Sequence, residues 1–173
     1  RTKAVSAPTG SGKTPVYVGY ALITGQPTCF VTDSRALQDQ LMREFSEIGL
    51  VDIRGRRNYP CPLKPDYTCE DGHQAACPYR GSVECPSSQA EMRAATSMLV
   101  VTNYDKWTAS RRFGQGMSHF QQVVFDEGHE APNALARALQ TVIHHRERER
   151  HIAMEPPADV ESLVAWRGWA VDA

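Results

Sequence analysis

The stretch Ala7-Pro8-Thr9-Gly10-Ser11-Gly12-Lys13-Thr14 decides the fold that we expect for this chain. It is a glycine-rich loop that ends in Gly-Lys-Thr. The apolar segment 3–7 before it suits a buried strand, and residues 16–23 after it can form a helix with an apolar face. This strand–loop–helix order is the context that a phosphate-binding loop requires, and it favours that interpretation over an ordinary glycine-rich turn.

The residue types in this loop suit the phosphate chain of a nucleotide and its Mg²⁺ ion. Gly10 and Gly12 allow backbone N–H groups to turn inward around phosphates. The start of the helix adds the positive end of its dipole. Lys13 can reach the β- and γ-phosphates, and the Thr14 hydroxyl can bind Mg²⁺. The residues expected to bind ATP are Thr9, Gly10, Ser11, Gly12, Lys13 and Thr14.

A second motif, Asp126-Glu127-Gly128-His129, supplies the acidic groups that such a loop needs. Asp126 follows the apolar segment 123–125, so we expect it at the carboxyl end of a strand, where it can hold Mg²⁺. Glu127 is placed to accept a proton from the attacking water, and His129 to relay between the nucleotide and whatever the protein grips. A plain surface turn is the alternative, and the phosphate-binding loop disfavours it. The expected catalytic residues are Glu127, Lys13, Asp126 and His129.

Strands and helices alternate around these motifs, which predicts an α/β fold with a mostly parallel sheet. Strands are expected at 27–32, 51–53, 98–102 and 123–125. Helices are expected at 35–48, 89–95, 131–140 and 160–170, with a charged run at 144–151. Residues 103–107 read as a turn into a helix or loop, and residues 111–116 as a flexible basic connector.

Size and composition limit the classes of protein that are possible. The 173 residues suit one domain, or one domain and a small insert. The net charge of −1 gives no global basic field, so contacts with nucleic acid must come from local patches. No apolar run approaches the ~20 residues that span a bilayer, and nothing resembles a signal peptide. We therefore expect no membrane partner and an intracellular, reducing compartment, cytoplasmic or, in a eukaryote, nuclear.

Four of the five cysteines follow one another at an even spacing, with seven residues between each pair: Cys61, Cys69, Cys77 and Cys85. Structural zinc sites usually draw their ligands from close pairs, which are absent here. A [4Fe–4S] cluster accepts longer spacers, so the spacing favours the cluster over zinc. His73 is either a spare ligand or an exposed loop residue. Cys29 lies alone in an apolar run and is expected in the core.

Basic and aromatic residues surround these cysteines although the whole chain is close to neutral. Positive charge next to aromatic rings is typical of a surface that binds single-stranded nucleic acid, while a merely solubilising surface is the alternative. The expected contacts are Arg54, Arg56, Arg57, Tyr59, Lys64 and Arg80, with Tyr67 and Tyr79 nearby and Arg111 and Arg112 as weaker candidates.

These motifs resemble those of superfamily 2 helicases of the DEAH type, and in particular the XPD/DinG-like iron–sulfur DNA helicases. The phosphate-binding loop and Asp126-Glu127-Gly128-His129 match the first and second motifs. Residues 37–41 look like the segment after motif Ia, and residues 56–61 like the lead-in to the first cluster cysteine. Residues 101–104 are similar to the segment that follows the family's iron–sulfur insert.

The resemblance implies a P-loop NTPase of RecA-like fold whose sheet is interrupted by a cysteine-rich iron–sulfur insert. It assigns residues 1–54 and 89–150 to the first RecA-like domain and residues 55–88 to the insert. The implied cofactors are ATP, Mg²⁺ and a [4Fe–4S] cluster. The implied activity is ATP hydrolysis coupled to 5′-to-3′ movement on single-stranded or forked DNA, with unwinding.

Two departures from the family pattern matter. Gly128 stands where the family usually has alanine, which we expect to be tolerated. The chain also lacks the second RecA-like domain with its arginine finger, which suggests an N-terminal motor fragment of a longer protein. The family's Arch insertion is absent unless residues 151–173, expected to start a further helical segment, are its beginning. A DNA-stimulated translocase that does not unwind, and a zinc-stabilised nucleic-acid-binding module, remain open alternatives.

Overall fold

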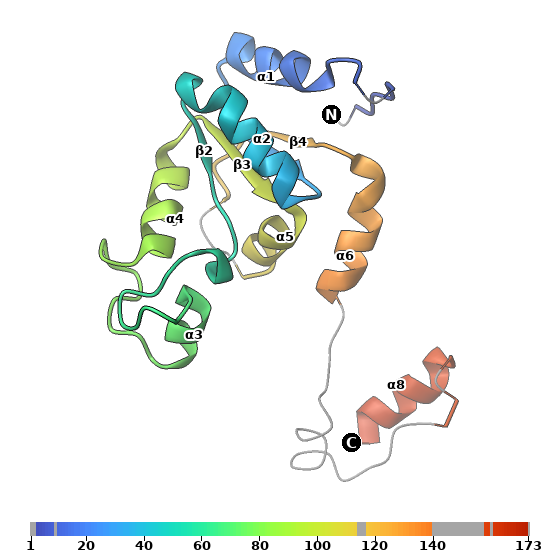
Figure 1. Ribbon diagram of the computed structural model, residues 1–173. Coiled ribbons are helices and arrows are strands. Elements are labelled where there is room, and N and C mark those ends of the chain that lie inside the picture. The colour runs from blue at the N-terminus through green and yellow to red at the C-terminus, as the bar shows by residue number, and fades with distance from the viewer. Residues whose placement is uncertain (1–2, 9, 114–116, 140–157, 160, 173) are drawn as a thin grey trace. The chain divides into compact units, whose positions relative to one another are not determined.

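Four parallel strands form the sheet at the centre of the computed structural model, which describes residues 3–8, 10–113, 117–139, 158–159 and 161–172 (Figure 1). The sheet order is β2-β3-β1-β4. Its strands are β1 (Thr28–Thr32), β2 (Leu50–Asp52), β3 (Leu99–Asn103) and β4 (Gln122–Phe125). The parallel α/β architecture predicted from the alternating pattern is confirmed.

Helices α1 (Lys13–Thr24) and α2 (Arg35–Phe45) pack on one face of the sheet, and α4 (Pro86–Thr96), α5 (Tyr104–Phe113) and α6 (Ala131–Leu139) contribute to the core on the other. The other described α-helices are α3 (Cys69–Gln74) and α8 (Leu163–Asp172). Short 3₁₀ turns occur at η1 (Ser46–Ile48), η2 (Arg56–Asn58) and η3 (Gly128–Glu130). The segment that carries α3 lies well away from α1 (Figure 1).

The core has two layers because successive side chains of a strand point to opposite faces of the sheet. Phe30 in β1 packs with α1 and α2 residues such as Val18 and Leu41. Its neighbours Cys29 and Val31 pack on the other face, with Tyr104 at the start of α5. All five residues of β1 are buried, as is typical of a strand covered on both faces. The expectation that Cys29 is a core residue is confirmed.

The segment before the glycine-rich loop is not the buried strand that its apolar residues predict. Residues 3–6 are exposed, with Val5 at 86% exposure, and residues 3–8 contain no strand. A strand needs a neighbour for its hydrogen bonds. Among the described residues β4 pairs only with β1, and nothing pairs with residues 3–8. The prediction failed because pairing is a long-range property that local apolarity does not reveal.

Several element boundaries also differ from those predicted. The helix expected at 35–48 ends at Phe45 and continues as η1, which leaves Ile48 exposed, and Gly49 ends it with a φ of 88°. Residues 111–113 belong to α5 rather than to a connector. Residues 114–116 and the charged run 144–151 lie outside the described residues.

The chain divides into two compact units, residues 1–138 and 139–173. The second contains α8, which the sequence predicted at 160–170, and there Trp166 and Trp169 meet edge to face with ring centroids 5.4 Å apart. None of the described helices has the length and apolar content to cross a membrane.

Replacing Leu41 by alanine tests the packing of α2 on the sheet. Leu41 is fully buried, so we expect Leu41→Ala to lower the free energy of unfolding by about 2–5 kcal/mol. The matched control is Ile23→Ala in α1, because Ile23 is 88% exposed and should change the unfolding free energy by less than about 0.5 kcal/mol. Urea denaturation measures both, and equal effects would contradict this packing.

Candidate functional site

The glycine-rich loop turns sharply into α1. Gly10 and Gly12 have φ values of 78° and 75°, a left-handed conformation that glycine adopts without steric cost. Helix α1 starts at Lys13, and no described side chain caps it at Gly12. The first N–H groups of α1 are therefore free for an anion. Thr9, one of the predicted nucleotide-binding residues, lies outside the described residues.

Lys13 connects the loop with the acidic motif after β4. Its Nζ donates a hydrogen bond to the Ala7 carbonyl oxygen at 3.0 Å, which spans the loop. The same Nζ lies 4.0 Å from Glu127 Oε1. The Lys13 ammonium group of the loop therefore faces the carboxylate of Glu127, the expected base, although the two residues are more than a hundred positions apart.

Asp126 is held at the end of β4 by hydrogen bonds with four residues. Its N–H donates to the Val31 carbonyl of β1 at 2.9 Å, which continues the strand pairing by one residue. The Tyr17 hydroxyl donates to Asp126 Oδ2 at 2.9 Å, and the Glu127 N–H donates to Oδ1 at 3.0 Å. The Tyr104 hydroxyl donates to the Asp126 carbonyl at 3.2 Å. Its carboxylate therefore has a fixed orientation.

Glu127 has a backbone conformation that is unusual for a residue with a side chain. Its φ and ψ are 50° and 49°, in the left-handed region. Such conformations cost free energy and concentrate at functional sites. His129 lies beside it, with Nδ1 3.4 Å from Glu127 Oε2 and Nε2 3.5 Å from Glu130 Oε1, and is 70% exposed. The base and relay candidates are thus neighbours on one turn.

Tyr17 and Tyr104 are site residues that the sequence reasoning missed. Tyr17 lies three residues after Thr14 on α1, so both share one face of the helix. This three-residue spacing is the one feature of the sequence that could have identified Tyr17 as a site residue. Burial, and to a smaller degree the charge of Asp126, raise the pKa of Tyr17 above its usual value, although a hydrogen bond with Thr14 acts in the opposite direction. Burial and the same carboxylate raise the pKa of Tyr104 to about 12. Both hydroxyls therefore stay protonated and remain donors.

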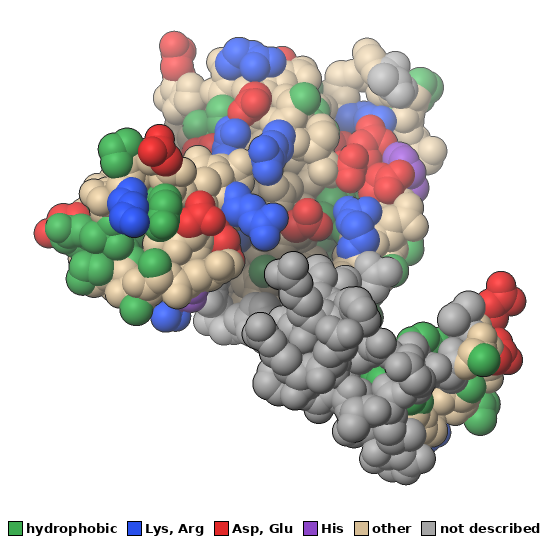
Figure 2. All heavy atoms as spheres, turned by 60° about the horizontal axis from the view of Figure 1, so that its bottom comes forward, with side chains coloured by type: hydrophobic (Ala, Val, Ile, Leu, Met, Phe, Trp, Pro, Cys, Tyr) green, Lys and Arg blue, Asp and Glu red, His purple; other side chains and the backbone are tan. Residues whose placement is uncertain are grey.

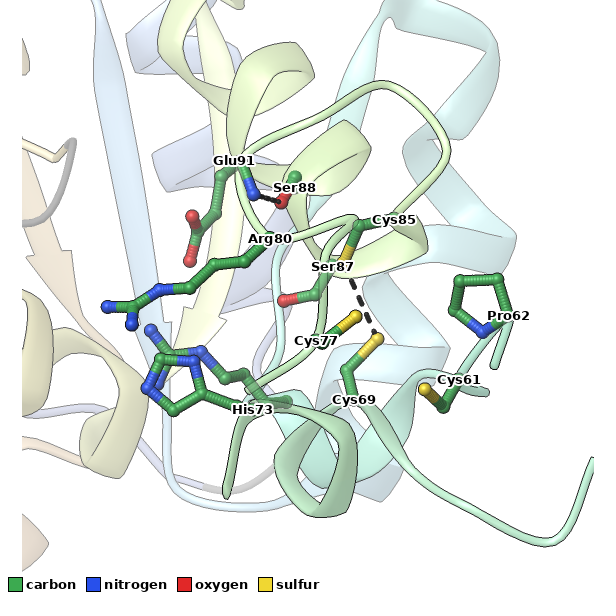
Figure 3. Close-up of a pocket in the computed structure, with 12 residues that line it drawn as sticks. Cys61, Pro62, Cys69, His73, Cys77, Arg80, Cys85, Ser87, Ser88 and Glu91 are labelled. Atoms are coloured by element: carbon green, nitrogen blue, oxygen red, sulfur yellow. Dashed lines mark hydrogen bonds between the residues drawn. The ribbon is translucent and has the colours of Figure 1, made fainter. Parts of the chain in front are cut away.

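The four evenly spaced cysteines line one cavity of about 280 Å³, and Figure 3 shows their thiol groups turned toward the same space. Cys61 follows η2, Cys69 is the first residue of α3, and Cys77 follows α3. Cys85 immediately precedes α4. Cys61, Cys69 and Cys85 are buried, and Cys77 is partly exposed. The fold thus brings together four cysteines from four separate local structures.

Local hydrogen bonds shape this cysteine pocket. The backbones of Cys61 and Cys69 bond to Tyr67 and Tyr59 across a short antiparallel contact. Thr68 and Asp71 form a capping box that starts α3. These bonds show that the segment has its own framework.

Gly72 gives the Cys61 thiol its space in the pocket. A Cβ atom added at Gly72 would lie 2.6 Å from Cys61 Sγ, so only glycine fits there without displacing that thiol.

The sulfur atoms do not form a complete site for a single metal ion. Cys69 and Cys85 are 3.7 Å apart at Sγ. Among the described residues no three His, Cys, Asp or Glu side chains are close enough to hold a metal ion together. Burial raises the pKa of Cys69 to about 11. Burial acts in the same direction on Cys85, but hydrogen bonds from Ser88, and then from Cys69, lower the pKa of Cys85 overall.

The predicted nucleic-acid contacts differ in their surroundings. Arg54 pairs with Asp39 and Asp52, and its N–H donates to the Tyr59 hydroxyl, so Arg54 and Tyr59 brace the segment against α2 and β2. Arg56 and Arg80 line the cysteine pocket with His73, whose pKa is lowered by partial burial and by both arginines. Lys64 lies over the Tyr67 ring at 4.7 Å. Arg57 is exposed.

Charge on the surface is mixed. Figure 2 shows Lys and Arg side chains interspersed with Asp and Glu on the face that it displays, with no continuous basic surface there. This agrees with a net charge of −1 and leaves local groups of basic residues as the candidates for nucleic-acid contact.

The comparison with known families covers both halves of the nucleotide site. The family model described as "Type III restriction enzyme, res subunit" matches residues 1–154, which include the glycine-rich loop, the cysteine segment and Asp126. No curated protein matched the chain significantly. The match is at the level of superfamily 2 helicases and does not separate the XPD/DinG-like branch from the others. On this evidence the chain belongs to the type III restriction enzyme res-subunit family, and it is an ATP-binding, superfamily 2 helicase-type motor domain.

Proposed function

We propose that the chain is the nucleotide-binding half of an XPD/DinG-like DNA helicase, which couples ATP hydrolysis to 5′-to-3′ movement on single-stranded DNA and to unwinding. One observation carries the proposal. One end of the sheet brings together the Lys13 ammonium group, the Thr14 hydroxyl and the carboxylates of Asp126 and Glu127. The direction of movement and the DNA substrate rest on the sequence resemblance.

The residues at this sheet end suit ATP and Mg²⁺. The free N-terminus of α1 and the left-handed glycines provide N–H donors for phosphates. Thr14 and Asp126 would hold Mg²⁺, which neutralises charge on the phosphates when it is bound. Glu127 accepts the proton of the attacking water, and its position 4.0 Å from Lys13 puts it beside the phosphate-binding cation. The fixed backbone of Asp126 keeps this arrangement rigid.

For DNA we propose a set of basic and aromatic residues of the cysteine segment, of which all but the half-buried Arg56 are exposed. Arg56, Arg57, Lys64 and Arg80 supply positive charge, and Tyr79, which is 37% exposed, offers a ring for stacking. Arg54 contributes less to this surface because two carboxylates already neutralise it. Movement along single-stranded DNA requires a second DNA-binding site, which we assign to a second RecA-like domain of the same protein.

For the cysteine pocket we propose a [4Fe–4S] cluster in an insert at residues 55–88. A tetrahedral zinc ion with Zn–S bonds of about 2.3 Å would bring all four sulfurs within about 3.8 Å of one another. Cys69 and Cys85 meet that distance, but no three of the described candidate ligands lie close enough for one ion. The cavity of about 280 Å³ also exceeds the space of a single ion, since a water molecule needs about 10–15 Å³. The proposal of a larger group with four metal atoms rests on the even spacing of the cysteines and on the sequence resemblance.

A polarity assay on the complete motor tests the proposed function. Duplexes with a 5′ or a 3′ single-stranded tail should differ, with ATP-dependent strand separation from the 5′ tail. ATP hydrolysis that DNA stimulates, without strand separation from either tail, would instead support a translocase and contradict the helicase.

Changes at Glu127 and Lys13 separate turnover from binding. In the complete motor, Glu127→Gln should keep nucleotide affinity within about threefold and lose at least ~100-fold in kcat, since it removes the base and not the phosphate contacts. Lys13→Ala should weaken nucleotide binding itself. Titration with a fluorescent ATP analogue and a phosphate-release assay measure the two quantities. Turnover like that of the wild type from Glu127→Gln would exclude Glu127 as the base.

Metal analysis of anaerobically prepared protein tests the cluster. We expect about four iron and four sulfide per chain and a brown colour. Stoichiometric zinc without iron would contradict the cluster. Cys61→Ser should lower the iron content while the nucleotide domain stays folded.

Gly72→Ala probes the pocket without removing a ligand. The added methyl group displaces the Cys61 thiol, so iron content should fall. The metal-free forms of this variant and of the wild type should unfold at similar temperatures, because an unbound thiol can rotate away. Gly128→Ala is the matched control, because a Cβ there meets no described atom within 4 Å. Full iron content in Gly72→Ala would show that Cys61 is not a ligand.

A further inference from the structure

Tyr17 lies between the two side chains expected to hold Mg²⁺. Its hydroxyl oxygen is 2.9 Å from Asp126 Oδ2 and 3.4 Å from Thr14 Oγ1. The two partners come from different parts of the fold, since Thr14 lies in the first turn of α1 and Asp126 follows β4. One phenol therefore joins the loop side of the nucleotide site to its strand side.

The Tyr17 ring is held firmly in this position. It packs against Phe30 of β1 with ring centroids 5.4 Å apart and an interplanar angle of 35°. Phe30 is fully buried at the centre of the sheet. Since the ring packs against a fully buried side chain of β1, its hydroxyl has little freedom to move away from the two oxygen atoms.

The hydrogen-bond chemistry of the three groups fits a metal site. A phenol has one proton, and a carboxylate is a stronger acceptor than a hydroxyl. When Tyr17 donates to Asp126, the Thr14 hydroxyl can donate its own proton to the Tyr17 oxygen. That leaves a lone pair of Thr14 directed elsewhere, which is what a hydroxyl needs in order to bind a cation while it keeps its proton.

We propose that Tyr17 is a positioning residue for the magnesium–nucleotide site, because its hydroxyl fixes the orientations of Thr14 and Asp126 together. The inference rests on the proposed function, in that Mg²⁺ and nucleotide must bind between these residues. Groups that orient metal ligands typically change metal affinity by about 10–100-fold when they are removed. The effect of losing the hydroxyl should therefore appear in the Mg²⁺ dependence and not in the contacts with phosphates.

Tyr17→Phe removes the hydroxyl and keeps the ring against Phe30. Binding of a fluorescent ATP analogue to the chain is measured over a range of Mg²⁺ concentrations and in EDTA. We expect the Mg²⁺ concentration for half-maximal binding to rise about tenfold, within the range seen for such groups, while affinity in EDTA stays unchanged. Circular dichroism checks that the variant is folded. Tyr20→Phe is the matched control, since Tyr20 is 56% exposed one turn further along α1, and it should behave like the wild type.

A double-mutant cycle shows whether Tyr17 acts through Asp126. Asp126→Asn should itself raise the Mg²⁺ requirement, and adding Tyr17→Phe to it should change that requirement less than about twofold. Full additivity would overturn the inference. So would unchanged or tighter Mg²⁺ dependence in Tyr17→Phe, or an equal loss of affinity in EDTA, which would mean that the hydroxyl only supports the loop. If the unaltered chain bound no nucleotide with Mg²⁺, the proposed function itself would be overturned.

Discussion

Strand β1 hydrogen-bonds to a parallel neighbour along each of its edges, and both apolar layers pack on its side chains. Its pairing with β4 aligns Val31 with Phe125, and the next residue, Asp126, bonds back to the Val31 carbonyl. The ladder thereby sets where the acidic motif emerges. The buried side of β1 also supports Tyr17 through Phe30. Both halves of the nucleotide site thus take their positions from one five-residue strand.

The cysteine pocket is tied to the same core through two helices. Cys85 precedes α4, whose Ala90 and Ala94 are buried. Glu91 of α4 pairs with the nearly buried Lys106 of α5 at 2.8 Å. Helix α5 begins at Tyr104, whose hydroxyl donates to the Asp126 carbonyl. The pocket and the nucleotide site therefore share a continuous set of contacts, even though they lie in different parts of the chain.

Much of the fold can be predicted from local patterns in the sequence, because buried strands and amphipathic helices have apolar residues in runs or at regular spacing. The loop at 7–14 was found from its glycine-lysine-threonine motif, and the carboxylates after β4 from the apolar run that precedes them. The exposure of segment 3–8 could not be predicted, since its apolar residues say nothing about a missing neighbour. Arg54 looked like part of a basic surface, because composition cannot reveal a partner fifteen residues earlier, at Asp39. Tyr17 was overlooked because its role depends on a contact with a residue more than a hundred positions away.

Gly72 offers a marker for natural variation in related chains. The Cys61 thiol occupies the space that a side chain at position 72 would need, so the two positions constrain each other. A relative that had lost the cysteines would be free of this constraint, and any small side chain could enter α3 at the equivalent place. A relative that keeps all four cysteines should keep the glycine as well. The residue at this one position would then distinguish relatives whose cysteine pocket still binds the proposed cofactor from relatives whose pocket no longer does.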